Sequence, residues 1–226
     1  MVPIPTPILR FVHVDNLLTL IRRGGLHAPN CIPNDGFIYR PILSPSIQAA
    51  RSVIPIRCGP GGTIHDYVPF YFGPLSPMML NLKTGRVTGY AQGQEPLVYC
   101  VSSAQAIARA GIGFVFTDGH ALATPITAWF DDLVDLEKID WPLVTQRYWQ
   151  DSTHDMDRKR RKQAEFLVQH SCPWHCIERL VVINQAMKLR VENVLAHFPP
   201  SDHKNIEVNL HSFPTRRSSD YRKSVV

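Results

Sequence analysis

The stretch RKQAEFLVQHSCPW (residues 161–174) places an acidic residue, Glu165, directly before an apolar run. The residues that follow, Phe166 to Val168, predict a β-strand that begins at Glu165. Because side chains alternate between the faces of a strand, Glu165 and Leu167 are expected on one face and Phe166 and Val168 on the other. A carboxylate among apolar neighbours is paired with a base, caps backbone N–H groups or has a function. The stretch alone leaves these three interpretations open.

Five consecutive basic residues, Arg158 to Lys162, lie just upstream of Glu165. Such a run is most often the solvated face of a helix. The alternative is contact with phosphate groups, which fixes the position of a nucleic acid without reading its bases.

The bulk composition predicts a water-soluble protein with one domain of generous size or two small ones, and the lack of an internal repeat or a linker favours one. The chain has 226 residues, of which 44% are hydrophobic, enough for a sizeable core. No apolar run approaches the roughly 20 residues that span a bilayer, and the N-terminus lacks the pattern of a signal peptide. The cysteine count is odd, 5, and the cysteines are scattered, which is typical of reduced thiols. We therefore expect a cytoplasmic location and no membrane segment.

The formal net charge of +5 is concentrated near the C-terminus. Residues 211–226 carry four basic side chains against Asp220, which leaves the rest of the chain only mildly basic. This tail has no hydrophobic period. We expect one domain over residues 1–210, followed by a tail that is disordered or not native to the fold.

Strands and helices are predicted in mixed order. Strands are expected over residues 8–14, 67–72, 97–102, 114–117, 165–168 and 179–183, and helices over 16–23, 45–51, 103–110 and 185–198. Residues 125–162 are expected to be mostly helical. Pro69 requires its strand to be an edge or to carry a bulge. Since regular βαβ alternation is missing, the pattern indicates an α+β fold with a largely antiparallel sheet.

Two clusters resemble binding motifs but favour structural roles. Cys172 and Cys176, with histidines beside them, crowd into one short segment, whereas structural zinc requires four ligands in a tetrahedral array. We therefore expect buried thiols and no metal. The glycines of CGPGG (58–62) match neither common phosphate-binding pattern, which favours a turn. His65 and Asp66 are adjacent, so their side chains point to opposite faces of an extended chain.

Six stretches, in order, resemble the DarT family of DNA ADP-ribosyltransferase toxins. They are VHVDNLLTLIRRGGL (12–26), SIQAARS (46–52), GGTIHDYVPFYFGPLSPMM (61–79), GQEPLVYCVSSAQAI (93–107), FVFTDGHA (114–121) and KQAEFLV (162–168). The resemblance covers most of residues 8–200 and leaves out the C-terminal tail.

The resemblance implies the ADP-ribosyltransferase fold, a split and mainly antiparallel sheet with flanking helices and an NAD cleft. It implies a toxin that transfers ADP-ribose from NAD to a base of single-stranded DNA, with thymidine expected, and releases nicotinamide. NAD is the co-substrate. The partners implied are single-stranded DNA and a macrodomain antitoxin that removes the modification. We expect the protein to act as a monomer.

Site residues follow from the positions that match the family's motifs. Glu165 of QAEFLV falls on the family's catalytic glutamate, and Arg51 of SIQAARS on its active-site arginine. The residues expected to bind NAD are Arg10, His13, Asn16, Leu17 and Tyr71. Those expected to contact DNA are Met78, His120, Lys159 and Arg160. The chain departs from the pattern at Arg10, where relatives carry histidine, and at Leu75, where some carry arginine.

The chemistry implied for Glu165 is stabilisation of positive charge. Breaking the bond between nicotinamide and ribose gives a transition state that resembles an oxocarbenium ion. A fixed carboxylate stabilises that charge, and a strand holds it rigidly. Two alternatives are a transferase of the same fold that acts on RNA or protein, and a nucleic-acid-binding module without turnover.

Overall fold

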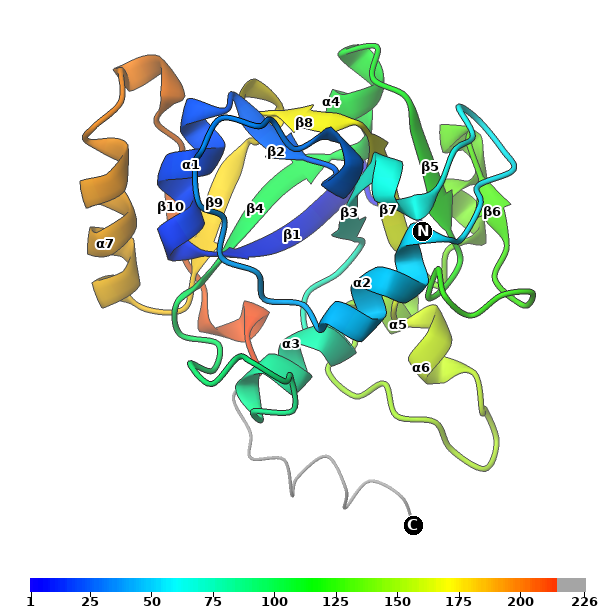
Figure 1. Ribbon diagram of the computed structural model, residues 1–226. Helices are drawn as coiled ribbons and strands as arrows, with labels where there is room; N and C mark the ends of the chain where they lie inside the picture. The colour runs from blue at the N-terminus through cyan, green and yellow to red at the C-terminus, as the bar shows by residue number, and fades with distance from the viewer. Residues whose placement is uncertain (215–226) are drawn as a thin grey trace.

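The computed structural model describes residues 1–214, which form an α+β fold around an eight-stranded sheet (Figure 1). In spatial order the strands are β10 (Asn205–Val208), β9 (Arg179–Val182), β4 (Leu97–Ser103), β1 (Pro7–His13), β3 (Tyr67–Tyr71), β7 (Glu165–Gln169), β5 (Phe114–Thr117) and β6 (Trp129–Phe130). A second sheet pairs β2 (Gly25–His27) with β8 (Ser171–Pro173). The pair β9–β10 is parallel and the other ladders among residues 1–214 are antiparallel, so the predicted fold class is confirmed.

The large sheet splits between β1 and β3. These strands pair at a single position, Leu9 with Tyr71, whereas β1 pairs with β4 along its whole length. Pro69 faces this split, and its carbonyl oxygen accepts a hydrogen bond from Arg10 Nη1 at 2.9 Å. Pro69 was expected on an edge or a bulge, but it lies in an inner strand. The split tolerates it there because a backbone N–H on that side would have no strand partner.

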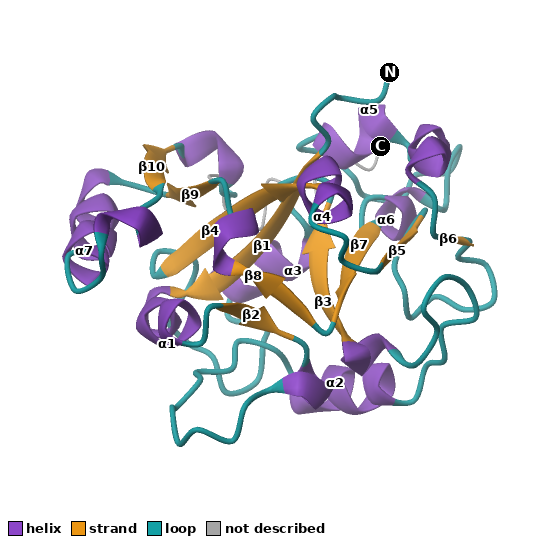
Figure 2. Ribbon diagram, turned by 90° about the horizontal axis from the view of Figure 1, so that it is seen from above, coloured by secondary structure: helices purple, strands orange, loops and turns teal. Residues whose placement is uncertain are grey.

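Seven α-helices within residues 1–214 flank the sheets. They are α1 (Leu17–Arg22), α2 (Pro45–Ser52), α3 (Pro77–Lys83), α4 (Ala104–Arg109), α5 (Trp141–Thr145), α6 (Arg158–Arg161) and α7 (Gln185–Leu195) within residues 1–214. Helix α7 packs beside β10 and α1 at one end of the sheet, and β6 lies at the other end (Figure 2). Helices α2, α3 and α6 gather near the split (Figure 1). Within residues 1–214 every helix falls short of the length and hydrophobicity needed to cross a membrane.

The expectation that residues 125–162 are mostly helical is wrong. This segment contains β6, the 3₁₀ helix Leu133–Lys138, and the short helices α5 and α6, joined by loops. The apolar residues that favoured a helix, such as Leu136 and Trp141, are buried. They anchor an irregular segment onto the core. Their spacing in the sequence resembles the apolar period of a helix although the segment is mostly not helical.

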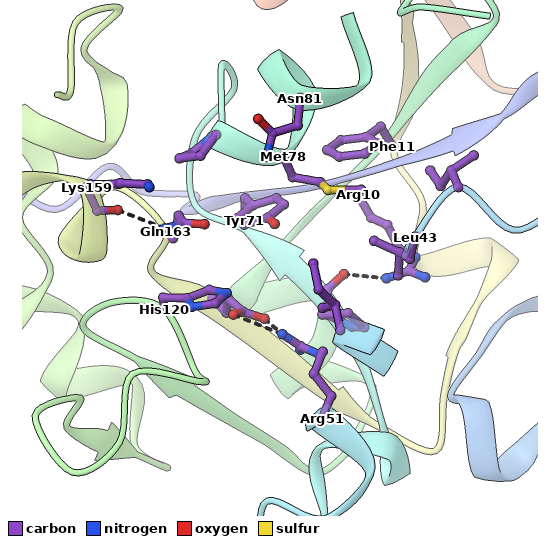
Figure 3. Close-up of a pocket in the computed structure, with 15 residues that line it drawn as sticks. Arg10, Phe11, Leu43, Arg51, Tyr71, Met78, Asn81, His120, Lys159 and Gln163 are labelled. Atoms are coloured by element: carbon purple, nitrogen blue, oxygen red, sulfur yellow. Dashed lines mark hydrogen bonds and ion pairs between the residues drawn. The ribbon is translucent and has the colours of Figure 1, made fainter. Parts of the chain in front are cut away.

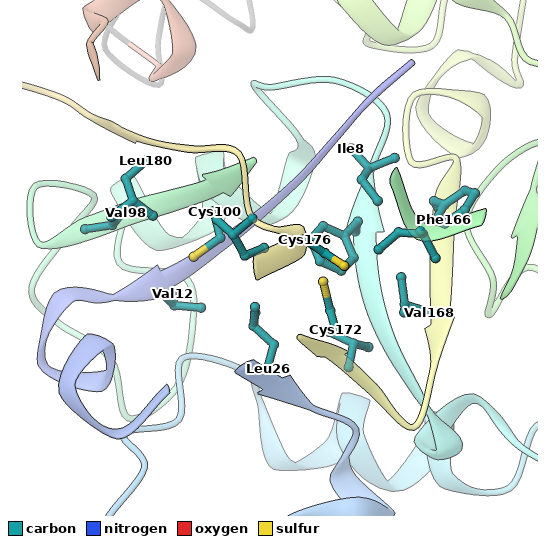
Figure 4. Packing of buried hydrophobic residues seen from close by; sticks show 14 of the residues in the cluster. Ile8, Val12, Leu26, Val98, Cys100, Phe166, Val168, Cys172, Cys176 and Leu180 are labelled. Atoms are coloured by element: carbon teal, nitrogen blue, oxygen red, sulfur yellow. The ribbon is translucent and has the colours of Figure 1, made fainter. Parts of the chain in front are cut away.

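The alternation predicted for β7 is confirmed. Phe166 and Val168 are fully buried in the main hydrophobic cluster, while Leu167 is buried in a separate cluster on the opposite face of the sheet. Figure 4 shows Cys172 and Cys176 with their sulfur atoms inside the main cluster, where both are free thiols. Burial raises the pKa of the Cys172 thiol well above its usual value. In residues 1–214 no group of His, Cys, Asp and Glu side chains is arranged to hold a metal ion.

The packed chain extends beyond the boundary predicted at residue 210. Phe213 is fully buried and its ring contacts that of Tyr99, with the ring centroids 5.3 Å apart. The carbonyl oxygen of Pro214 accepts a hydrogen bond from Gln94 Nε2 at 2.8 Å. The rest of the predicted tail, residues 215–226, lies outside the described residues.

Candidate active site

A buried ion pair joins Arg51 and Glu165 beside the split. Arg51 lies in the last turn of α2, and Glu165 is the first residue of β7. Arg51 Nη2 lies 2.8 Å from Glu165 Oε2, and Arg51 Nη1 lies 3.2 Å from Glu165 Oε1. The exposed fractions are 7% for Arg51 and 2% for Glu165. The two-pronged contact fixes the carboxylate in both position and orientation.

The loop between β5 and β6 supplies a further donor to Glu165. The backbone N–H of Ala121 donates to Glu165 Oε1 at 3.1 Å. Thr117 Oγ1 accepts from the Glu165 backbone N–H at 3.1 Å and donates to the Gly119 carbonyl at 2.7 Å, which ties this loop to β7. Burial raises the pKa of Glu165, but the attraction and hydrogen bonds of Arg51 outweigh it, and the pKa stays below its usual value. The carboxylate is therefore an anion at neutral pH.

The pair forms part of a pocket of about 320 Å³, here called the first pocket (Figure 3). One wall consists of Arg10 and Phe11 of β1 with Ile42 and Leu43 of the loop before α2. The opposite wall consists of His120 of the β5–β6 loop, Lys159 of α6 and Gln163. Tyr71 of β3 and residues of α3, including Met78 and Asn81, complete it.

A second pocket of about 200 Å³ adjoins the first. The two pockets share Arg10, Ile42 and Leu43, and the second extends along the loop before α2 to Tyr39 and Arg23. The Arg10 guanidinium is held by the Pro69 carbonyl, and its Nε has no hydrogen-bond partner. In residues 1–214 no carboxylate pairs with Arg10, so its charge is available to a ligand that spans both pockets.

Two titratable side chains of the first pocket are shifted toward their neutral forms. Burial raises the pKa of Tyr71, and the Glu165 carboxylate adds to the rise. Burial also lowers the pKa of His120 below 6.5, with the positive charges of Arg51 and Lys159 acting in the same direction. Glu165 opposes this effect on His120. Near neutral pH the pocket thus presents a phenol and a neutral imidazole.

Three residues expected to bind NAD do not line either pocket. His13 is buried and hydrogen-bonds Gln92 through Nε2 at 2.7 Å. Asn16 donates to the Arg40 carbonyl and accepts from the Arg40 N–H, and Leu17 is fully buried in the main core. Asn16 thereby holds the loop before α2, whereas His13 contacts Gln92 and Leu17 packs in the core. A resemblance in sequence could not separate such supporting positions from those that face a ligand.

Two members of the basic run, Arg160 and Arg161, are neutralised by carboxylates from other parts of the chain. Arg160, expected to contact DNA, instead forms ion pairs with Asp118 at 2.8 Å and Asp157 at 2.7 Å and is largely buried. Arg161 pairs with Asp140 and Asp155. The run is therefore neither a solvated face nor a continuous surface for phosphate.

Lys159 is the member of the run that faces the first pocket. Its side chain is exposed, and no carboxylate among residues 1–214 pairs with its ammonium group. Met78 and His120, also expected to contact DNA, line the same pocket. Sequence reasoning missed Phe11, Asn81 and Gln163. Gln163 lies in the turn between α6 and β7, where no strand alternation applies, so the sequence pattern offered no signal for it.

The site combines two features: an arginine holds a carboxylate where a mainly antiparallel sheet splits, and two joined pockets lie beside this pair. This combination indicates a class of enzyme. It is the class of ADP-ribosyltransferases, which cleave the bond between nicotinamide and ribose. Comparison with known proteins identifies the family within this class. The family model described as "ssDNA thymidine ADP-ribosyltransferase, DarT" matches residues 9–213.

Relatives agree with that model. The chain is 41% identical over 197 residues to a DNA ADP-ribosyl transferase of Thermus sp. (strain 2.9), covering 87% of this chain and 90% of the relative. The solved structure of Thermus sp. 2.9 DarT in complex with ADP-ribosylated ssDNA superposes with a TM-score of 0.87 at 37% identity, covering 94% and 98% of the two chains. The same protein in complex with NAD+ gives a TM-score of 0.84 at 36% identity, covering 95% and 100%. The chain therefore belongs to the DarT family, and the family and fold expected from the sequence are confirmed.

Proposed function

We propose that this protein transfers ADP-ribose from NAD+ to the base of thymidine in single-stranded DNA and releases nicotinamide. The observation that carries the proposal is the buried Arg51–Glu165 pair, which fixes an anion at the floor of the first pocket. Membership of the DarT family, and a relative solved with NAD+ and with ADP-ribosylated ssDNA, support the choice of substrates.

The two joined pockets suit an extended dinucleotide. We place the nicotinamide ribose in the first pocket near Glu165 and the adenosine half along the second pocket. Arg10 lies between them, with a guanidinium that no carboxylate of residues 1–214 neutralises, and is suited to the pyrophosphate. This placement keeps Arg10 and Tyr71 as NAD-binding residues and assigns His13, Asn16 and Leu17 to support of the surrounding chain.

Glu165 acts on the sugar of NAD+. As the bond from the ribose C1′ to nicotinamide breaks, its electron pair moves to the nicotinamide nitrogen and positive charge develops on the ribose. The Glu165 carboxylate is already anionic and needs no reorganisation to stabilise that charge. Arg51 and the Ala121 N–H keep the carboxylate in place during the reaction.

The DNA base approaches from the wall opposite Arg10. Lys159, at the rim of that wall, is suited to a DNA phosphate, and Met78 provides an apolar contact. A ring nitrogen of thymine can enter the pocket only when it has no pairing partner, so the substrate is single-stranded or flipped DNA. Arg160 is reassigned from phosphate contact to support of the β5–β6 loop.

The acceptor is tested by supplying labelled NAD+ with separate pools of single-stranded DNA, RNA and protein. We expect label on thymidine-containing DNA and release of one nicotinamide per transfer. Label on RNA or protein alone identifies a transferase with another acceptor. Tight DNA binding without nicotinamide release identifies a binding module.

Two partner expectations are proposals as well. We propose that a macrodomain antitoxin reverses the modification; the test is loss of the DNA label when a macrodomain hydrolase encoded beside this chain is added. We also propose that the protein acts as a monomer, because residues of one chain form both pockets. Light scattering of the active protein tests this, and a dimeric mass contradicts it.

A further inference from the structure

Transfer to thymidine leaves one proton unaccounted for. Of the two ring nitrogens of thymine, one is bonded to deoxyribose and the other carries a hydrogen. When the second nitrogen bonds to C1′ of ADP-ribose, its N–H bond must break and the proton needs an acceptor. The departing nicotinamide takes the electron pair of the broken C–N bond and no proton, so the acceptor has to come from elsewhere.

Most polar side chains of the first pocket are unsuited to accept it. Arg51 remains protonated, and the Lys159 ammonium group has donors but no lone pair. The Glu165 carboxylate is engaged by Arg51 and by the Ala121 N–H, and its pKa lies below the usual value, which makes it a weak base. Tyr71 is held as the neutral phenol.

His120 has the geometry that these residues lack. Its backbone is fixed on both sides: its N–H donates to the Arg160 carbonyl at 3.0 Å, and its carbonyl accepts from Thr127 Oγ1 at 2.9 Å. Its ring lines the first pocket on the same side as the end of the Arg51 side chain (Figure 3), and Glu165 lines the same pocket. No side chain or backbone group among residues 1–214 hydrogen-bonds the ring, so its nitrogens are free to meet a substrate.

The charged groups around the ring favour a neutral imidazole with one acceptor nitrogen. Glu165 of β7 raises the pKa of His120, while burial, Arg51 of α2 and Lys159 of α6 lower it, and the net result is below 6.5. A neutral histidine with a free ring nitrogen is the group most often used as a general base.

We propose that His120 is the general base of the transfer, taking the ring N–H proton of thymine as the nitrogen bonds to C1′. The electrons of the N–H bond form the new bond to the sugar, the C1′–nicotinamide bond breaks toward nicotinamide, and the imidazolium later returns its proton to solvent. The inference rests on the proposed function, since it requires thymidine as acceptor.

The test compares acceptor bases of different acidity. Single-turnover rates are measured on one oligonucleotide that carries thymidine, 2′-deoxyuridine or 5-fluoro-2′-deoxyuridine at the target position. The deoxyuridine version isolates the loss of the methyl group, and the fluorinated base has a more acidic ring N–H. The proteins are the unaltered chain, His120→Gln, His120→Asn and, as a matched control, His197→Gln, at an exposed position two residues beyond the end of α7.

We expect His120→Gln to slow transfer to thymidine by about 10²-fold to 10⁴-fold, the usual contribution of a general base. On the fluorinated base the reduction in rate caused by His120→Gln should be smaller by about tenfold or more, because a more acidic N–H loses its proton with less assistance from a base. The rate of the unaltered protein should fall with acid below pH 6.5, and the variant should lack this limb. NAD+ affinity should be unchanged in all variants.

An equal loss on all three bases, or a variant rate close to that of the unaltered protein, overturns the role of His120. If His120→Gln loses NAD+ affinity through misfolding, His120→Asn and the pH profile of the unaltered protein decide instead; a rate that does not fall in acid below pH 6.5 overturns the proposal. An unaltered protein that modifies none of the oligonucleotides refutes the proposed function itself, which is a separate result.

Discussion

Removing Arg51 should destabilise the fold as well as stop the reaction. Arg51→Met leaves the Glu165 carboxylate buried without its countercharge, since both guanidinium contacts, at 2.8 and 3.2 Å, are lost. Breaking a buried ion pair by removing one partner costs about 3–5 kcal/mol, because an uncompensated charge stays in the interior. The retained Ala121 N–H at 3.1 Å offsets a part of this cost, so the lower end of the range is expected.

The double variant Arg51→Met/Glu165→Gln separates charge from packing. It removes both charges, and replacing a buried ion pair by uncharged groups often changes the free energy of unfolding very little. We therefore expect the double variant to recover most of the stability that the single variant loses, while remaining inactive. Urea unfolding followed by tryptophan fluorescence gives the free energies of all three proteins, provided that unfolding is reversible.

The pH dependence of the free energy of unfolding provides a second test of the buried ion pair. In the unaltered protein the pKa of Glu165 is lowered on folding, so its contribution to stability is present above pH 4.5 and is lost as the pH falls below that value. In Arg51→Met the pKa of Glu165 should rise above 4.5, so that the folded state favours the protonated acid and stability falls as the pH rises toward neutral. The stability gap between the two proteins should therefore narrow in acid. A gap below about 1 kcal/mol at pH 7, or one that widens in acid, would refute the buried-pair interpretation.

Further outcomes follow from the basic residues. Lys159→Ser should weaken DNA binding and make the plot of log affinity against log salt concentration shallower by about 0.7, because one contact with a single-strand phosphate is lost. The control Arg109→Ser, on helix α4, should leave this slope unchanged. Arg160→Met should reduce the transfer rate by loosening the β5–β6 loop without changing that slope; a shallower slope would restore the DNA contact first expected for it. Burial lowers the pKa of Lys162 from 10.5 to about 7. Between these two pH values the unfolded chain binds a proton that the folded chain lacks, so the free energy of unfolding increases with pH. In urea unfolding, the stability of the unaltered protein relative to Lys162→Met should therefore rise from pH 7 to pH 9. A flat difference would show that the ammonium form persists in the fold.

The catalytic strand was predictable because local pattern and tertiary environment agree there. The alternation after Glu165 correctly assigned Phe166 and Val168 to the main core, and the helix predicted over residues 103–110 corresponds to α4, Ala104–Arg109. The proline at position 69 was correctly identified as a disturbance of a strand. That it lies at a split inside the sheet depends on the partner strand, which a local pattern does not contain.

The site was less predictable because its charges are paired over long distances. Arg160 lies 42 residues from Asp118 in the sequence, and Arg51 lies 114 residues from Glu165. A run of basic residues predicts a continuous basic surface when the carboxylates that pair with it, distant in the sequence, are unknown. Similarly, a resemblance marks His13 and Asn16 as part of a motif without saying whether their side chains face a ligand or a neighbouring loop.

The most direct measurement is the single-turnover rate of Glu165→Gln with saturating NAD+ and a thymidine-containing single-stranded oligonucleotide, with both nicotinamide and the modified base quantified by mass spectrometry. The unaltered protein should form the two products in equal amounts. The variant should bind NAD+ with similar affinity and react more slowly by a factor on the order of 10³, because the developing positive charge on the ribose loses its anion. A variant that keeps the rate of the unaltered protein would contradict the role of Glu165 and the mechanism built on it.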